Sequence, residues 1–313
     1  MELIRGLRNL EPRHRGTVAS IGNFDGMHLG HQAVLKDLKR RARSLAAPST
    51  VILFEPQPQE YFAPARAPVR LTRFMEKWPL LEAAGVDRVL CLRFGRVLAA
   101  MSAEHFVQEI LVQALKVRHL TVGDDFRFGK DRRGDFGLLE RAGAAAGFGV
   151  TDTASLEAAG ERVSSTRIRA LLVEGEMEDA ARLLGRPYSL SGRVMHGARL
   201  GRDLGFPTAN LALKRRTPPV SGIFAARVRG AAEEPVPAAA YIGKRPAAGG
   251  VDWVVEAHLL GHSGDLYSRR LEVELLHRLR EDQHFDSLDG LRAQIQKDVA
   301  AAQTWLDMNA RKQ

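Results

Sequence analysis

Two histidines three residues apart lie near the start of the chain, in the stretch GNFDGMHLGH at positions 22–31. The residues before this stretch predict a strand and those after it predict a helix, so His28 and His31 fall where a strand ends and a helix begins. Free backbone N–H groups attract phosphate at such a point, and imidazole donors can stabilise charge that grows on a phosphoryl oxygen. The stretch therefore predicts phosphate chemistry. Two surface histidines on a turn, or a zinc site, are the alternatives.

A second group of candidate phosphate ligands begins the pattern SSTRIRALL at 164–172. Its hydroxyl residues are Ser164, Ser165 and Thr166. They precede apolar residues at helical spacing, so hydroxyls and free N–H groups gather at a helix start. Arg167 or Arg169 can add positive charge, because guanidinium pairs well with phosphate. Taken alone, this pattern is an ordinary helix cap.

The second half of the chain contains a glycine-rich stretch, GRVMHGARLGRDLGFPTANL, at 192–211. Glycines such as Gly197 and Gly201 let the backbone approach a ligand closely. The prolyl bend in FPTAN can hold Thr208 and Asn210 side by side. Hydroxyl and amide oxygens are hard ligands that can share Mg²⁺ with a nucleotide. A tight turn with no ligand is the alternative reading.

A carboxylate interrupts an apolar strand pattern in the second half of the chain. Glu256 lies in WVVEAHLL, between apolar neighbours. Partial burial there would raise its pKa and its basicity. An outward-facing strand glutamate is the alternative.

The elements that must position these residues differ between the two halves. The first 155 residues alternate β-branched runs with helical patterns, which predicts a Rossmann-like α/β domain with a parallel sheet covered by helices on both faces. From about residue 183, short strands separated by turns predict a small antiparallel barrel or sandwich, closed by a helix that starts near Ser287. We predict domains at 1–185 and 186–313.

Particular elements follow from the hydrophobic periodicity. In the first half, strands are predicted at 17–23, 50–56, 86–94, 117–123 and 149–153, and helices at 30–46, 72–84, 102–115 and 135–147. Ser102 is the predicted N-cap of its helix. Pro79 is predicted to kink its helix or to mark a junction.

Composition restricts the class of protein. The 313 residues are 45% hydrophobic and carry a formal net charge of +9, which favours anionic ligands. No apolar run approaches the ~20 residues of a membrane span, and the N-terminus lacks a secretory signal, so we expect a cytoplasmic protein.

We expect the side chain of the single cysteine, Cys91, to be buried as a small apolar group. Low aromatic content and the basic run at 38–43 on a solvated helix face disfavour nucleic-acid binding. The sequence does not indicate an oligomeric state.

Several of these motifs resemble those of a known family. FDGMHLGH resembles the H-x-G-H signature of nucleotidyltransferases, with SSTRIRALL as the second, triphosphate-gripping element. LFEPQPQEYF at 53–62 and VGDDFRFGKDRRGD at 122–135 resemble flavin-side segments of the prokaryotic FAD synthetases. GFPTAN resembles the riboflavin kinase signature, and Glu256 matches that family's catalytic glutamate. Because the motifs occur in order, the chain resembles the bifunctional riboflavin kinase/FMN adenylyltransferases.

The resemblance implies that the second domain transfers phosphate from ATP to riboflavin, giving FMN. The first domain would then transfer AMP from ATP to FMN, giving FAD and pyrophosphate. It implies the catalytic residues His28, His31, Asn210 and Glu256, and Thr208 and Asn210 as ligands of Mg²⁺. The implied nucleotide-binding residues are Gly22, Phe24, Asp25, Gly26, His28, His31, Ser164, Ser165, Thr166, Arg169, Gly197, Gly201 and Thr208. The implied flavin-binding residues are Phe62, Asp125, Phe126, Phe128 and Arg280.

One departure from the family pattern concerns the kinase half. Where the family usually has a threonine in G-x-x-P-T, this chain has Ala247, so one hydroxyl near the flavin or nucleotide is lost. The kinase turnover or the affinity for substrate can therefore differ from that of family members with the threonine. Two other functions are compatible with the motifs: a non-catalytic flavin or nucleotide sensor on the same fold, and a nucleotidyltransferase with a different phosphorylated acceptor.

Overall fold

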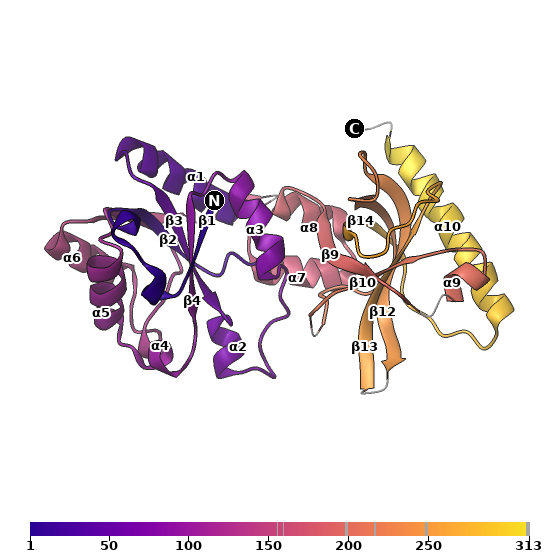
Figure 1. The fold of residues 1–313 in the computed structure, drawn as a ribbon, viewed down its shortest axis with the longest axis horizontal. Helices are drawn as coiled ribbons and strands as arrows, with labels where there is room; N and C mark the ends of the chain where they lie inside the picture. The colour runs from indigo at the N-terminus through magenta and orange to yellow at the C-terminus, as the bar shows by residue number, and fades with distance from the viewer. Residues whose placement is uncertain (155, 159, 198–199, 216, 248–249, 311–313) are drawn as a thin grey trace. The chain divides into compact units, whose positions relative to one another are not determined.

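The computed structural model describes residues 1–154, 156–158, 160–197, 200–215, 217–247 and 250–310. The chain forms two compact units, Met1–Ser164 and Ser165–Gln313 (Figure 1). No helix among the described residues is long and apolar enough to cross a membrane.

The first unit is built on a parallel sheet of six strands in the order β1-β4-β3-β2-β5-β6. The strands are β1 (Glu2–Arg5), β2 (Val18–Ile21), β3 (Ser49–Glu55), β4 (Arg88–Arg93), β5 (His119–Gly123) and β6 (Gly149–Thr153). The chain adds β3 and β4 on one side of β2 and then returns to add β5 on the other side. In open parallel sheets, ligands bind beyond the carboxyl ends of the strands where the order reverses. The residues that follow β2 occupy that position.

Helices cover both faces of this sheet, as the sequence predicts. They are α1 (Leu29–Ser44), α2 (Pro58–Phe62), α3 (Phe74–Ala83), α4 (Arg96–Ala100), α5 (Ala103–Phe106), η3 (Val107–Ala114) and α6 (Phe136–Ala146), with short turns η1 (Leu7–Asn9), η2 (Pro12–His14) and η4 (Lys130–Arg132). Alternate strand residues serve opposite faces: Val51 packs in the cluster with α1 and α3, and Ile52 packs in the cluster with α5, η3 and α6.

Three local features differ from the sequence prediction or refine it. Ser102 caps its helix, since its hydroxyl accepts a hydrogen bond from His105 N at 3.1 Å, but the helix continues over Val107–Ala114 as a π-helix. Pro79 lies inside α3, so it marks no helix junction. Cys91 is only half-buried, and its burial raises the pKa of the thiol.

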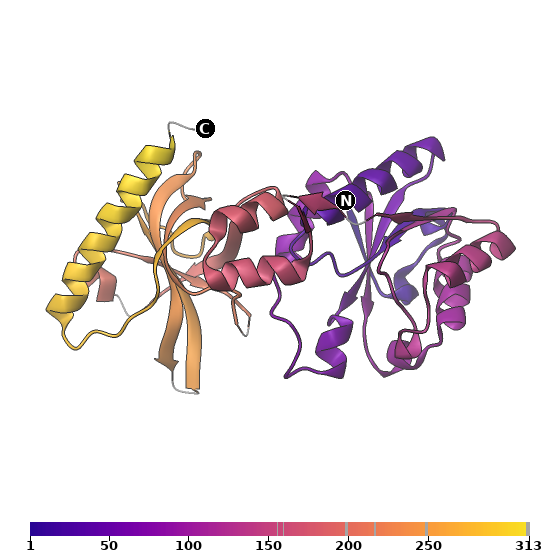
Figure 2. The ribbon, with the colours of Figure 1, turned by 180° about the vertical axis from the view of Figure 1, so that it is seen from behind.

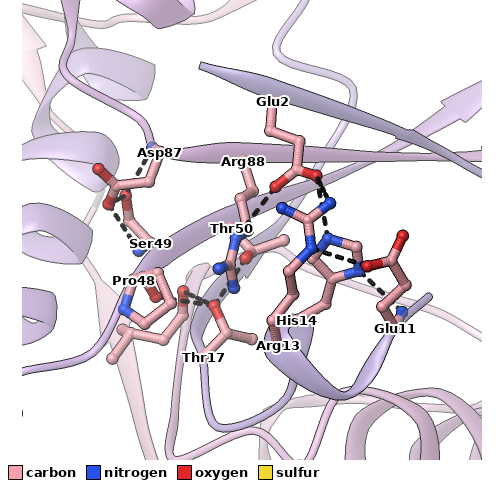
Figure 3. Close-up of polar contacts among 11 residues, drawn as sticks. Glu2, Glu11, Arg13, His14, Thr17, Pro48, Ser49, Thr50, Asp87 and Arg88 are labelled. Carbon is pink, nitrogen blue, oxygen red and sulfur yellow. Dashed lines mark hydrogen bonds and ion pairs between the residues drawn. The ribbon is translucent and has the colours of Figure 1, made fainter.

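The sequence analysis missed β1, a four-residue strand at the sheet edge. Polar contacts hold it there (Figure 3). His14, only 2% exposed, accepts from Glu11 N through Nδ1 at 2.9 Å, so its Nε2 carries the proton toward Glu2 Oε1, 3.1 Å away. Arg13 also donates to Glu2, at 2.8 Å. The hydrogen bond from His14 is the main reason that the pKa of Glu2 is lowered. Because β1 is only four residues long and is held by side chains of the following turn, its residues show no hydrophobic periodicity from which a strand could be predicted.

The second unit is a closed antiparallel barrel in the order β10-β13-β12-β11-β14-β9. Its strands are β9 (Tyr188–Met195), β10 (Ala209–Ala212), β11 (Gly222–Arg229), β12 (Val236–Ala247), β13 (Gly250–Leu259) and β14 (Arg270–Arg280). Phe224, Val255 and Val273 are fully buried. The long helix α10 (Leu288–Ala310) packs on the barrel (Figures 1 and 2), with Ala302 and Leu306 in the cluster of Ala225 and Ala239. Of the two architectures predicted for this half, the barrel is confirmed.

Two helices precede the barrel and pack within the second unit: α7 (Ser165–Glu174) and α8 (Met177–Leu184), which lie side by side (Figure 2). Arg278 of β14 donates hydrogen bonds to the carbonyls of Val173 and Glu174, at the end of α7. Gly175 has a φ angle of 84°, a left-handed conformation that favours glycine, and a Cβ there would also lie 2.0 Å from Arg278 Nε. The short helix α9 (Leu200–Asp203) and the two-stranded pair β7 (Glu157–Ala158) and β8 (Glu161–Arg162) complete the fold.

Candidate active sites

The turn between β2 and α1 carries the predicted histidines, and its backbone is strained. Phe24, Gly26 and Met27 have φ angles of 47°, 83° and 48°, and a non-glycine residue in this left-handed region costs about 1 kcal/mol or more. Such strain persists only where surrounding contacts determine the conformation, and it concentrates at functional sites.

Asp25 holds this turn. Its carboxylate accepts hydrogen bonds from Thr72 N at 2.9 Å, Thr72 Oγ1 at 3.2 Å and Leu71 N at 3.1 Å. Thr72 Oγ1 in turn accepts from Gly26 N at 2.9 Å. Asp25 is 3% exposed, and the predicted nucleotide residue Phe24 is equally buried, in the cluster with α1. Both therefore shape the turn, and their nucleotide contacts stay a prediction.

The structure brings His28 and His31 together as a stacked pair. Their ring centroids are 3.6 Å apart with an interplanar angle of 16°, and the ring of Phe24 lies 5.1 Å from that of His31. His28 is the N-cap of α1, and its Nδ1 accepts from His31 N at 3.3 Å. Since Nδ1 accepts, the ring proton of neutral His28 is on Nε2. A Cβ on Gly30 would lie 3.2 Å from the His28 ring, so a small residue suits that position.

His31 is held in its neutral form. Burial lowers the pKa of its imidazole well below the ordinary 6.5, and repulsion by the ammonium of Lys77 and by the protonated form of His28 lowers it further. In the described part of the chain, His31 Nδ1 is buried and has no hydrogen-bond partner. A neutral ring with an unused polar atom can donate to an incoming phosphoryl oxygen.

The second predicted phosphate element divides at the unit boundary. Ser164 is the last residue of the first unit, and Ser165 and Thr166 begin α7 in the second. Ile168 is fully buried, which agrees with the predicted helical spacing. Arg169 lies on the same helix, one residue beyond Ile168.

Aromatic rings link the two predicted flavin segments. Phe62, Phe94 and Phe54 form edge contacts with centroids 5.6 and 5.9 Å apart. The chain of rings continues from Phe54 through Phe106 to Phe128, at 6.4 and 5.5 Å. The sequence analysis did not select Phe94 or Phe106. Phe94 directly follows β4, so its position at the carboxyl edge of the sheet was the available signal.

These aromatic residues differ in accessibility. Phe62 is 64% exposed, whereas Phe128 is 7% exposed and lies in the core cluster of the α5 face. Phe126 stacks on Phe128 with an interplanar angle of 12°. Phe62 and Phe126 therefore offer ring surface, and Phe128 supports Phe126 from the core.

Two other predicted flavin residues are engaged by charged neighbours. Asp125 forms an ion pair with Arg162 at 3.0 Å. Arg280 donates to both carboxylate oxygens of Asp298 on α10, at 2.8 and 2.7 Å, and lies over the ring of Phe285. Arg280 therefore ties the end of β14 to α10, and a flavin contact for it stays a prediction.

The barrel brings the predicted kinase residues together by strand pairing. Asn210 of β10 is the direct cross-strand partner of Glu256 of β13, and directly opposed residues share one face of a sheet. Asn210 Nδ2 lies 3.5 Å from Thr208 Oγ1. Glu256 is 8% exposed. One patch of the barrel thus carries a hydroxyl, an amide and a buried carboxylate.

Glycines make room for this patch. A Cβ on Gly197 would lie 2.6 Å from the side chain of Asn210, and one on Gly201 would lie 2.5 Å from Phe206 O and 3.3 Å from Thr208 Oγ1. These glycines leave space for the side chains of Asn210 and Thr208, and the ligand approach predicted from the sequence stays a prediction. Ala247 belongs to β12, and its side chain lies outside the described residues.

Comparisons with known proteins match both halves of the chain. A family model for FAD synthetase matches residues 10–167, and one for riboflavin kinase matches residues 184–306. The chain is 47% identical to the bifunctional riboflavin kinase/FMN adenylyltransferase of Escherichia coli (strain K12), over 98% of this chain and 99% of the relative. It is 50% identical to the protein of that name from Pseudomonas fluorescens, over 96% and 97%.

A crystal structure of a protein named macrolide-efflux protein, from Streptococcus pneumoniae, superposes with a TM-score of 0.80 and 28% identity over 95% of this chain and 97% of that chain. The fold joins a nucleotidyltransferase-type sheet unit to a flavokinase-type barrel in one polypeptide. The chain belongs to the family of bifunctional riboflavin kinase/FMN adenylyltransferases. It is an enzyme that phosphorylates riboflavin and adenylylates FMN. Neither family model covers residues 168–183, so the predicted division at 185/186 stays a prediction.

The lowered pKa of His31 predicts a pH dependence of stability. Below about pH 6.5 the unfolded chain binds a proton at His31 that the folded chain excludes, so the free energy of unfolding should fall as the pH is lowered. His31→Gln should remove this contribution, which is at most about 1.4 kcal/mol per pH unit. Urea unfolding of both proteins at several pH values measures the difference. If the free energies of unfolding of the wild type and His31→Gln change with pH in parallel down to about pH 5, His31 is not held neutral by burial.

Proposed function

We propose that the two polar clusters are separate active sites, with riboflavin phosphorylation on the barrel and adenylyl transfer at the stacked histidines. The observation that supports this is the placement of the two clusters in different compact units, one with paired imidazoles after β2 and one with Thr208, Asn210 and Glu256. Each cluster has the chemistry that one of the two reactions needs.

On the barrel, Glu256 acts as the general base. It accepts the proton of the riboflavin 5′-hydroxyl while the oxygen attacks the γ-phosphorus of ATP and ADP leaves. Its 8% exposure favours a basic carboxylate, because burial disfavours the charged form. The remaining catalysis is positioning and charge neutralisation, as in phosphoryl transfer generally.

Both reactions use ATP, and enzymes of these classes require a divalent metal. For the kinase site we propose Mg²⁺, with Thr208 and Asn210 as its protein ligands. The fit rests on two neutral oxygen-bearing side chains in contact beside a carboxylate, since Mg²⁺ prefers hard oxygens and shares its shell with phosphates and water. When bound, the ion neutralises charge on the phosphate oxygens.

In the first unit, His28 and His31 stabilise the departing pyrophosphate, because imidazole N–H groups donate hydrogen bonds to its oxygens. The FMN phosphate is already an anionic nucleophile, so its attack on the α-phosphorus needs no strong base. Phe62 and Phe126 provide surfaces on which the flavin ring stacks. Because both reactions consume ATP, we also propose that the protein works in the cytoplasm.

Removal of one histidine should separate the two activities. With pure protein, riboflavin, ATP and Mg²⁺, His28→Ala should accumulate FMN at the wild-type rate, while FAD formation falls roughly 100- to 1000-fold, the usual effect of losing a charge-stabilising donor. Chromatographic separation of riboflavin, FMN and FAD measures both steps. Loss of FMN formation as well would contradict the assignment of the histidines to adenylyl transfer.

Removal of the barrel carboxylate should give the reverse result. Glu256→Gln should lower riboflavin phosphorylation roughly 100- to 10,000-fold, the range expected for a general base, and should leave FAD formation from supplied FMN unchanged. Glu272→Gln on strand β14 is a matched control, and its kinase rate should stay normal. A normal kinase rate in Glu256→Gln would exclude this carboxylate as the base.

The metal assignment predicts a change in ion requirement. Asn210→Ala removes one proposed ligand, so half-maximal kinase activity should need a higher Mg²⁺ concentration, by roughly tenfold if the lost contact is worth about 1.4 kcal/mol. The Mg²⁺ dependence of FAD formation from FMN should not move. Titration of Mg²⁺ at fixed ATP tests this, and identical kinase curves for the variant and the wild type would refute the assignment.

A further inference from the structure

A buried lysine stands behind the histidine turn. Lys77 of α3 is 2% exposed and is among the largest fully buried side chains of the described residues. A buried ammonium is strongly unfavourable unless neighbouring groups compensate it. Its Nζ donates a hydrogen bond to Asn23 O at 2.7 Å. Asn23 lies between β2 and the turn in which Phe24 and Met27 are strained.

Charged groups surround Lys77 from several elements. Asp25, Glu55 and Glu60 stabilise its charged form and Arg70 opposes it, while burial, the largest effect, lowers its pKa. Arg70 is itself held by both carboxylates: it donates to Glu55 at 3.0 and 2.8 Å and to Glu60 at 2.5 Å. The arginine and the two glutamates therefore satisfy one another, and Asp25 is committed to Leu71 and Thr72.

Lys77 acts on the histidines in two ways. It fixes the carbonyl at the entry to the turn that leads to His28, and its positive charge is one of the two charges that lower the pKa of His31, the other being that of His28. Asp25 and Thr72 hold the middle of the same turn. Without Lys77, the entry to the turn loses its side-chain contact, and the strained conformation has one fewer contact to maintain it.

We infer that Lys77 is a positioning residue for adenylyl transfer, because its ammonium fixes the Asn23 carbonyl and so sets the strained turn that presents His28 and His31. The inference rests on the proposed role of these histidines in FAD formation. Small displacements of catalytic groups produce large losses of rate, so a residue with no contact to the reacting atoms can control this step.

Lys77→Met tests the inference, because methionine fills a similar volume without charge or donor. FAD formation from FMN should fall roughly 10- to 100-fold, mainly in kcat, and riboflavin phosphorylation should not change. Lys39→Met is the matched control: Lys39 lies on α1 in the same unit and pairs with Asp87 at 3.0 Å, beside Ser49 at the start of β3 rather than its carboxyl end. Its FAD rate should stay normal.

A spectroscopic measurement separates positioning from simple loss of folding. Ring resonances of His31, assigned with His31→Gln, should titrate at higher pH in Lys77→Met than in the wild type, because one of the two charges that lower its pKa is gone. Lys77→Gln, which is neutral but polar, is the second variant if Lys77→Met does not fold, and the same two results are expected of it.

The outcomes separate the inference from the proposed function. Normal FAD formation in Lys77→Met, or a loss of rate with unmoved His31 resonances, overturns the positioning role. If His28→Ala also forms FAD normally, the proposed function itself fails. If His28→Ala loses FAD formation while Lys77→Met retains it, only the role of Lys77 is wrong.

Discussion

The hydrogen bonds from the backbone N–H groups of Leu71 and Thr72 to the carboxylate of Asp25 are the constraint on which the proposed adenylyl-transfer site depends. These partners are 46 and 47 residues apart in the chain, and together they hold a turn in which Phe24 and Met27 adopt left-handed backbone angles. A turn of this kind is unfavourable locally and exists only because a distant segment satisfies its polar groups. The stacked imidazoles follow directly from it, since His28 caps the helix that begins where the turn ends.

The second active site depends on strand register. Asn210 and Glu256 lie opposite each other because β10 and β13 pair antiparallel in one particular register. A shift of one residue would place them on different faces, since strand side chains alternate. The barrel is closed, which removes the free edges at which strands slip.

The two sites use electrostatics differently. At the histidines, burial and neighbouring positive charge lower the pKa of His31 and so favour its neutral form. On the barrel, the polar patch of Thr208, Asn210 and Glu256 includes a single carboxylate, and a carboxylate is a group that can accept a hydroxyl proton. The helix that carries Ser165 and Thr166 is packed on the barrel through Arg278. The predicted phosphate residues Ser165 and Thr166 therefore fold within the second unit.

Local features can be read from the sequence alone: the strand–turn–helix around His28, the cap at Ser102, and the ordered motifs that identified the family. These depend on neighbours within a few residues, so short-range periodicity and motif spacing reveal them. Other features depend on long-range contacts: Asp25 accepts hydrogen bonds that hold its turn, and Arg280 pairs with Asp298. In the same way, Phe128 is buried while Phe62 is exposed. Lys77 is buried and donates a hydrogen bond to Asn23 O. Burial and ion pairing are set by segments brought together from distant parts of the chain, and a helical pattern such as FMEKWPLL carries no sign of what its lysine will meet.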